Sequence, residues 1–398
     1  MTRAGREGAR PLRSRLLQPV IDLRTARAVG TTTVSGASTR LLVGPVNSAG
    51  QARAWAGAAA TLPDVAAANV VHVRPGDAFR FPADHAVPRS VAVGNRVWQR
   101  AQRRAVGRRF THVLIESGQQ LFGPADSVAE QAADLARDGV RVGLVWHGSD
   151  IRLPSAHARR EADSPFAGGR YADGAALEET AARNLALAQT SGLPSFVSTP
   201  DLLALVPGAT WLPVVVDPAD WRASSGPVLE RARPVVVHAP SRAGLKGSDL
   251  IEDTMARLHD EGVVEYRQLA GVAHADMPRV YGDADIVLDQ FSLGIYGVAA
   301  CEALAAGRVV VSHVDAGVRA TVRALTGEEL PILQSRAGDL EATIRDILQD
   351  RDAHRARAAF GPAFVTAVHD GRRSADALAG FLGAQGSPTG PMGDLTDA

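Results

Sequence analysis

The sequence contains a single cysteine, Cys301, in 398 residues. One thiol cannot form an intramolecular disulfide, so nothing in the composition points to an oxidising compartment. No cluster of Cys and His has the spacing of a metal site, and neither a secretory signal nor a run of about 20 apolar residues is present. We therefore expect a soluble, cytoplasmic protein that works without a metal or a bound cofactor.

The sequence also lacks net charge, because its 43 basic residues balance its 43 acidic residues. No overall field then favours nucleic acid or a membrane as the partner. Residues 1–40 are the exception, with eight Arg against Glu7 and Asp22. Their low hydrophobicity predicts a disordered basic arm over 1–39, and contact with an anionic membrane surface is the less favoured alternative.

Short apolar runs alternate with longer amphipathic segments from residue 40 onward, which indicates parallel sheets with crossover helices. A length of 398 residues suggests two domains. We place the first over 40–212, a Pro-containing crossing over 213–226, the second over 227–383 and a flexible tail over 384–398. In the first domain we predict strands near 41–43, 70–73, 91–93, 112–115, 140–146, 186–190 and 195–198, and an irregular excursion over 151–174.

Polar residues follow several predicted strands of the first domain. Asn47 and Gly50 lie in a small-residue loop after the predicted strand 41–43, and Glu116 directly follows the strand 112–115. His147 and Asp150 follow the strand 140–146. The carboxyl ends of parallel strands line the binding crevice of such a sheet, where these groups could contact sugar hydroxyls or a reacting centre. The alternative is ordinary βα turns, in which Asp150 only caps its own loop.

Lysine is almost absent, because 42 of the 43 basic residues are Arg and only Lys246 is Lys. A lysine kept in such a background suggests a site where the planar guanidinium does not serve. Lys246 lies four residues after Arg242, on a loop that follows a predicted strand at 234–237. Both groups could therefore reach one pyrophosphate, although a chance lysine on a solvated loop is the alternative.

A second glycine-rich segment lies in the same domain. Gly294, Tyr296 and Gly297 precede a predicted helix from Val298, so close backbone approach and N-terminal amides could bind anionic oxygen. Glu302 follows about one turn into that apolar helix, where a carboxylate needs a partner such as ribose hydroxyls. Together with Arg242 and Lys246, these residues predict a site for a nucleoside diphosphate.

The segments 238–247, 274–278 and 294–307 resemble the family 4 glycosyltransferases, retaining enzymes with the α/β GT-B fold of two Rossmann-like domains facing across a cleft. The resemblance implies a nucleotide-diphosphate sugar as donor and no metal. It also implies that Arg242 and Lys246 hold the diphosphate, that Glu302 binds the ribose, and that amides near Tyr296, Gly297 and Val298 meet phosphate or sugar oxygens. His147 would contact the transferred sugar, and the acceptor would be a small molecule, lipid or glycan.

The sequence departs from this family at Gly294, where a glutamate that touches the donor sugar is usual. Asp289, Gln290 or Ser292 could substitute for it. The departure keeps open a pseudo-glycosyltransferase, a sugar-nucleotide epimerase and a non-catalytic sugar-nucleotide-binding partner subunit. A dehydrogenase is disfavoured, because no G-x-G-x-x-G with a downstream acidic residue is present.

Overall fold

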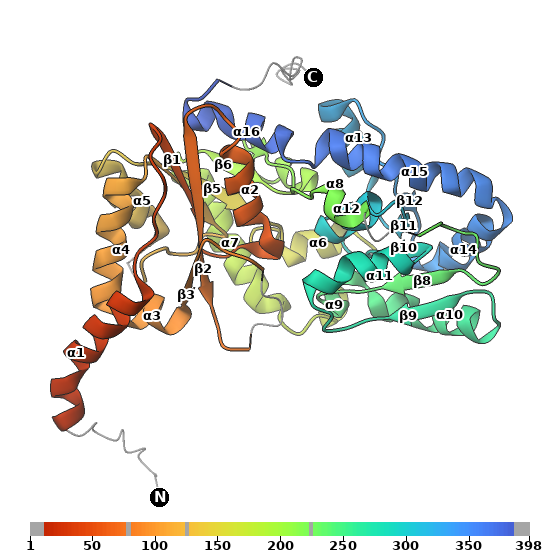
Figure 1. The fold of residues 1–398 in the computed structure, drawn as a ribbon. Coiled ribbons are helices and arrows are strands. Elements are labelled where there is room, and N and C mark those ends of the chain that lie inside the picture. The colour runs from red at the N-terminus through yellow and green to blue at the C-terminus, as the bar shows by residue number, and fades with distance from the viewer. Residues whose placement is uncertain (1–11, 77–80, 124–126, 223–225, 386–398) are drawn as a thin grey trace, which may run out of the picture.

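The computed structural model describes residues 12–76, 81–123, 127–222 and 226–385 of the chain. These residues form two parallel β-sheets that lie side by side with helices packed around them (Figure 1). Each sheet buries two apolar clusters, one on each face. The chain thus has two Rossmann-like α/β domains, as the alternating apolar runs predict.

The first sheet has seven strands in the order β3-β2-β1-β4-β5-β6-β7. Its apolar runs are buried on both sides, since Leu42 packs into one cluster and Leu41 and Val43 into the other. The strands are β1 (Thr39–Gly44), β2 (Val65–Val73), β3 (His85–Pro88), β4 (His112–Glu116), β5 (Arg141–Trp146), β6 (Ser195–Val197) and β7 (Thr210–Trp211).

The second sheet has five strands in the order β12-β11-β10-β8-β9. They are β8 (Val235–His238), β9 (Glu265–Gln268), β10 (Ile286–Leu288), β11 (Val309–Ser312) and β12 (Leu333–Gln334). The direction in which strands are added reverses between β1 and β4 in the first sheet and between β8 and β10 in the second. Ligands of open α/β sheets bind at such switch points, beyond the carboxyl ends of the strands.

Helices connect the strands of both sheets. In the first part of the chain they are α1 (Leu12–Val29), α2 (Gln51–Ala59), α3 (Arg89–Gly94), α4 (Arg96–Arg109), α5 (Val128–Arg137), α6 (Pro154–Arg160), α7 (Gly174–Thr190) and α8 (Pro218–Arg222). The rest are α9 (Ala243–Lys246), α10 (Ser248–Asp260), α11 (Met277–Asp283), α12 (Val298–Ala305), α13 (Ala316–Thr326), α14 (Leu340–Gln349), α15 (Arg351–Val368) and α16 (Arg372–Leu382).

Four segments differ from the structure that the sequence predicts. Residues 91–93 belong to α3, because three apolar residues alone do not distinguish a strand from a helix. Residues 186–190 continue α7, as their Ala and Leu content favours. The excursion 151–174 contains α6, and the basic arm 1–39 contains α1, which packs against α4. Residues 1–11 of the arm and the tail beyond residue 385 lie outside the described residues.

The chain passes between the domains twice, and the two passages are bonded to each other. His369 accepts a hydrogen bond at its backbone oxygen from Val216 N at 2.8 Å, and its Nδ1 lies 2.8 Å from Val214 O. Beyond this point α16 returns to the first sheet, where Phe381 packs against His112 and Phe196. The final helix therefore fastens the second domain to the first.

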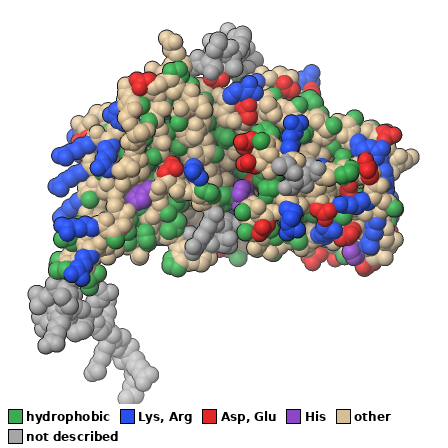
Figure 2. Space-filling view, viewed as in Figure 1, with side chains coloured by type: hydrophobic (Ala, Val, Ile, Leu, Met, Phe, Trp, Pro, Cys, Tyr) green, Lys and Arg blue, Asp and Glu red, His purple; other side chains and the backbone are tan. Residues whose placement is uncertain are grey.

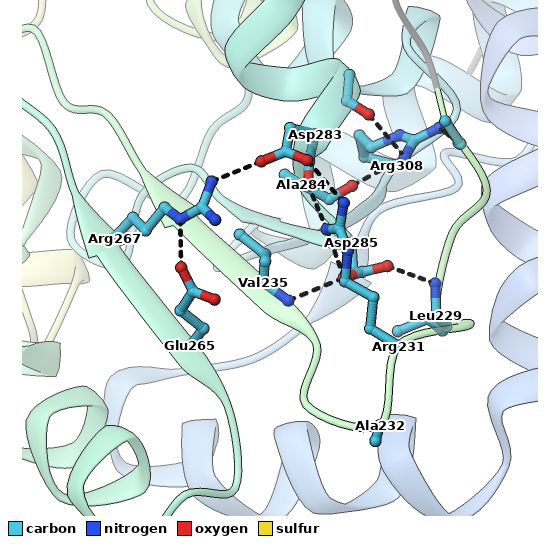
Figure 3. A network of polar contacts seen from close by, with 12 residues as sticks. Leu229, Arg231, Ala232, Val235, Glu265, Arg267, Asp283, Ala284, Asp285 and Arg308 are labelled. Carbon is cyan, nitrogen blue, oxygen red and sulfur yellow. Dashed lines mark hydrogen bonds and ion pairs between the residues drawn. The ribbon is translucent and has the colours of Figure 1, made fainter.

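A network of polar contacts closes the amino-terminal edge of the second sheet (Figure 3). Asp285 is fully buried, and its carboxylate accepts hydrogen bonds from Leu229 N at 2.6 Å and Val235 N at 2.8 Å. Arg231 Nη1 lies 3.2 Å from the same carboxylate. This edge is opposite the carboxyl ends of the strands, so Asp285 serves the fold.

We predict that Asp285→Ala lowers the free energy of unfolding by about 3–5 kcal/mol, because two buried N–H groups and an arginine lose their acceptor. Asp283→Ala is the matched control, because Asp283 pairs with Arg231 and Arg267 but its side chain is 49% exposed. For the control we expect a loss of less than about 1 kcal/mol. Urea unfolding of both variants measures the difference, and equal losses would show that Asp285 is not the centre of the network.

Candidate functional site

Glu116 organises the polar residues at the carboxyl edge of the first sheet. It ends β4, which lies between β1 and β5, so its side chain reaches the loops that follow both neighbours. One carboxylate oxygen accepts hydrogen bonds from Val46 N and Asn47 N, both at 2.8 Å. The other lies 3.0 Å from His147 Nε2. Three loops of the first domain thus meet at one buried carboxylate.

His147 is held on two sides. Its ring stacks on Trp55 with ring centroids 5.4 Å apart, and Trp55 Nε1 donates to Pro213 O at 2.8 Å. Burial disfavours the charged imidazole, but the hydrogen bond to Glu116 and the charges of Glu116 and Asp150 outweigh it. The pKa of His147 is therefore raised above its usual value of 6.5. A charged or hydrogen-donating ring at this edge suits an anionic or hydroxyl-rich ligand.

Asp150 and Asn47 lie in the same group of loops, but their polar atoms are already bonded. Asp150 accepts hydrogen bonds from its own loop, from His147 N at 3.0 Å and Gly148 N at 2.8 Å. Asn47 donates to Pro82 O at 3.1 Å and accepts from Arg53 N at 3.2 Å. These two side chains therefore shape the loops that carry His147 and Glu116.

The second sheet brings Lys246, Asp289, Glu302 and His274 together. Lys246 Nζ bonds Asp289 Oδ1, and Phe291 N donates to the Lys246 carbonyl at 2.8 Å. The loops after β8 and β10 are thus tied together at the switch point of this sheet. Glu302 Oε1 lies 2.8 Å from His274 Nε2.

The positive groups of this cluster only partly offset the cost of burying the Glu302 carboxylate. Burial raises the pKa of Glu302, although the hydrogen bond to His274 and the positive charges of His274 and Lys246 oppose the shift. The same hydrogen bond raises the pKa of His274. His238 lies behind the cluster and bonds Leu288 O and Ser248 Oγ; burial lowers its pKa to about 4, so it is neutral at pH 7.

Several groups at this edge lack a partner among the described residues. Asp289 Oδ2 and Ser292 Oγ are buried and have no hydrogen-bond partner. Arg242 is exposed, and no described side chain pairs with its guanidinium. A Cβ placed on Gly297 would meet nothing within 4 Å, so the backbone before α12 faces open space. An exposed arginine without a partner and open backbone before α12 are features that an anionic ligand could use, and each unpaired buried polar atom calls for an explanation.

The side chains of Tyr296 and Gln290 direct their polar atoms away from this edge, whereas the prediction for Tyr296 concerns its backbone amide. Tyr296 is buried in the apolar core, with its hydroxyl 3.3 Å from His369 Nε2. Gln290 accepts from Leu293 N at 2.7 Å and donates to Ile295 O at 2.5 Å. Gln290 thus fixes the loop that contains Gly294.

Phe81 joins the two groups of residues across the domain junction. It precedes β3 in the first domain, and its ring lies 4.9 Å from the ring of His274 in the second. A Cβ on Gly50 would lie 3.1 Å from Phe81 Cδ1, so glycine is needed where the ring passes the loop after β1. Phe81 therefore connects the predicted acceptor-side loop to the partner of Glu302.

Glu161 fills the space where Gly294 has no side chain. A Cβ on Gly294 would lie 3.3 Å from Glu161 Oε1, and Gly294 has a φ of +67°. Glu161 follows α6 of the first domain and is 2% exposed. Its other oxygen lies 3.1 Å from His313 Nε2 and 3.5 Å from Arg336 Nη2 of the second domain. A carboxylate from the first domain thus lies beside position 294, where the family 4 enzymes that the sequence resembles usually have a glutamate.

Sequence reasoning did not find Phe81, Glu161 or the pairing of His274 with Glu302. His274 lies in a segment that carries the family resemblance, which could have indicated it. Phe81 and Glu161 have no comparable signal, because each acts on a residue more than a hundred positions away. The excursion 151–174 also contacts the second domain through His157, which lies 3.2 Å from Leu293 O, and Arg170, which pairs with Asp249.

Solved structures show which fold this is. A sucrose-phosphate synthase from Thermosynechococcus elongatus superimposes with a TM-score of 0.53 at 13% identity, over 86% of this chain and 98% of that one. The HepE protein of Anabaena, solved with UDP and glucose, gives a TM-score of 0.55 at 12% identity, over 87% and 99%. A glycosyltransferase from Rickettsia africae gives 0.50 at 12% identity, over 87% and 99%.

The chain has the GT-B fold. No protein-family model matches it, and no curated protein sequence matches it either. In this GT-B chain the described residues contain no group of three or more His, Cys, Asp or Glu that could hold a metal ion.

We predict that Gly294→Glu lowers the free energy of unfolding by about 2–4 kcal/mol. The backbone at this position is left-handed, which residues with a side chain disfavour, and the new side chain enters the space of Glu161. By itself, Glu161→Ala should also lower the free energy of unfolding. In the double variant, however, the total loss should be smaller than the sum of the two single losses. A coupling energy of at least about 1 kcal/mol in denaturant unfolding is expected.

The matched control for this cycle is Gly168→Glu. Gly168 has a φ of +60°, but a Cβ there would meet nothing within 4 Å. This change should show only the backbone cost of about 1–2 kcal/mol and should be additive with Glu161→Ala. If both glycine substitutions are additive with Glu161→Ala, the two residues do not share one space.

We predict that Glu116→Gln lowers the pKa of His147, because burial then acts without the opposing carboxylate. In the native protein His147 should titrate above 6.5; the pair then stabilises the fold below pH 6.5 and loses this contribution as pH rises through the folded-state pKa. NMR titration of labelled histidines measures the shift. His72, whose pKa burial lowers to about 4, is the internal control. An unchanged His147 pKa in the variant would contradict the role of Glu116.

Proposed function

We propose that this protein is a metal-independent, retaining glycosyltransferase similar to family 4, which moves a sugar from a nucleoside-diphosphate sugar to an acceptor hydroxyl. The observation that carries the proposal is the cluster of Lys246, Asp289, Glu302 and His274 at the switch point of the second sheet. It places a compact cation, a buried carboxylate and unpaired polar atoms beside the open start of α12.

The second domain supplies groups for each part of the nucleotide. Lys246 is a point charge that is paired with Asp289 and near Glu302, where it can bind a diphosphate without the width of a guanidinium. Arg242 has no described partner and can supply a second positive charge. The backbone N–H of Val298 can donate to a phosphate oxygen at the start of α12. Glu302 can accept hydrogen bonds from ribose hydroxyls, because His274 orients one of its oxygens.

The first domain then supplies the acceptor side. Asn47 and Gly50 shape the loop after β1, and His147 stands beside it on Glu116. We assign His147 to the transferred sugar and Asp150 to the positioning of His147, since Asp150 bonds the backbone of that loop.

The proposed step breaks the bond between the anomeric carbon and the diphosphate and forms one to the acceptor oxygen on the same face of the sugar. The acceptor hydroxyl loses its proton to the leaving phosphate oxygen, so no other base is required. Arg242 and Lys246 stabilise the negative charge that develops on the diphosphate.

We further infer that Glu161 replaces the glutamate that the family has at position 294. Its carboxylate oxygen lies next to Gly294, whereas Gln290, which the sequence offered as a substitute, is used within its loop. Asp289 retains one unpaired oxygen and can add a second contact to the sugar. The sugar-facing carboxylate would then come from the first domain.

A panel of nucleoside diphosphates and their sugars tests the function. UDP and UDP-glucose are the first probes, because the HepE protein was solved with UDP-glucose. Binding by calorimetry together with slow release of the free nucleotide would support a transferase. Failure of every nucleotide to bind would reject the donor site, and binding without turnover over many acceptors would favour a non-catalytic partner subunit.

We predict that Lys246→Arg weakens binding of the preferred nucleoside diphosphate by about tenfold or more, because a planar fork replaces a point charge in a space bounded by Asp289. Arg345→Lys is the control; Arg345 pairs with Glu261 and Glu341 on the surface. Calorimetric Kd values compare the two. Equal affinity for native protein and Lys246→Arg would mean that the only lysine has no special role.

A further inference from the structure

The chain has no net charge overall, but three helices of the first domain have a large excess of positive charge. Helices α1, α3 and α4 contain 11 Arg and a single carboxylate, Asp22. Figure 2 shows basic side chains gathered over the side of the molecule where α1 and α4 lie in Figure 1. The sequence predicts a basic arm only for residues 1–39, whereas most of this excess belongs to α3 and α4.

Four arginines form a stripe along α4. Arg96, Arg100, Arg104 and Arg108 are spaced four residues apart, and all four are exposed. None of their guanidinium groups has a hydrogen bond or ion pair with a described residue. Like charges at this spacing repel one another on a helix, so the stripe costs stability unless an anionic partner covers it.

Exposed apolar side chains lie next to the start of this stripe. The described residues include five large hydrophobic side chains that are exposed, and four of them are on α1 and α3: Val20, Ile21, Leu23 and Val93. The fifth, Phe360, is on α15 of the second domain. Large apolar groups concentrated in one place on a surface mark an interaction site.

One hydrogen bond brings these features together. Asn95, between α3 and α4, donates from Nδ2 to the carbonyl of Asp22 on α1 at 2.9 Å. Asp22 lies between Ile21 and Leu23, and Asn95 lies between Val93 and Arg96. The exposed apolar residues Ile21, Leu23 and Val93 and the first arginine of the stripe are therefore within two residues, along the chain, of this contact.

We propose that α1, α3 and α4 form a surface that binds an anionic lipid bilayer, with the arginines against the lipid headgroups and Ile21, Leu23 and Val93 inserted between them. The apolar residues favour a membrane over nucleic acid, because phosphate backbones attract arginine but offer nothing for exposed aliphatic side chains. No described helix is long and apolar enough to cross a membrane. The protein would thus lie on the bilayer surface.

Sedimentation of the full-length protein with vesicles tests this proposal without any nucleotide, so the result does not depend on the proposed enzyme activity. We expect binding to vesicles of phosphatidylcholine with phosphatidylserine, weaker binding at high salt and little binding to phosphatidylcholine alone. Equal binding to both vesicle types, or binding to neither, would overturn the proposal.

Two matched pairs of variants locate the surface. Arg104→Glu and Leu23→Ser should each weaken vesicle binding, the charge reversal by about tenfold or more. Arg357→Glu and Phe360→Ser are the controls, because α15 also presents an exposed arginine without a described partner and an exposed apolar residue. The controls should bind as the native protein does, with thermal unfolding unchanged in all four.

Two results would replace the lipid interpretation. If all four variants lose affinity equally, vesicle binding follows net charge or bulk hydrophobicity and does not involve this surface. If double-stranded DNA binds with Arg104 required and Leu23 irrelevant, the surface serves nucleic acid.

Discussion

The carboxylate of Glu116 has no exposed surface, and the first half of the site depends on how that buried charge is satisfied. A buried carboxylate without donors would cost several kcal/mol, so the loops after β1 and β5 must bring donors to it. They do so with two backbone N–H groups and the ring of His147. The position of His147 and the shape of the Asn47 loop are therefore consequences of one charge at the end of β4.

The second domain has a buried carboxylate at each edge of its sheet, and the two carboxylates differ in how fully they are hydrogen-bonded. Asp285, at the amino-terminal edge, receives donors on both oxygens and is fully bonded. Asp289, four residues later and beyond the carboxyl end of β10, bonds Lys246 through one oxygen and leaves the other buried without a described partner. Folding alone explains the first arrangement. The unpaired oxygen of Asp289 beside Lys246 is one of the observations on which the proposed donor site rests.

Local sequence signals predicted much of the fold and part of the candidate site. Apolar runs placed most strands. Residues after β1, β4 and β5 came together in the first domain, and residues after β8 and β10 in the second, because the carboxyl ends of parallel strands lie at the same edge of each sheet. Short runs failed at 91–93, where tertiary packing chose a helix. The side chains of Tyr296 and Gln290 could not be oriented from sequence, since both lie in a loop whose path is set by hydrogen bonds to the other loops.

Nothing in the sequence connects Gly294 with the excursion 151–174, but in the structure Glu161 of the excursion lies next to Gly294. At the domain junction the carboxylate of Glu161 contacts His313 and Arg336 of the second domain, and the absence of a side chain at Gly294 leaves room beside it. A glutamate at position 294 would belong to the second domain, so it would be present at the donor site whether or not the first domain is in contact. If Glu161 acts in place of that glutamate, as we propose, completion of the site depends on contact between the two domains.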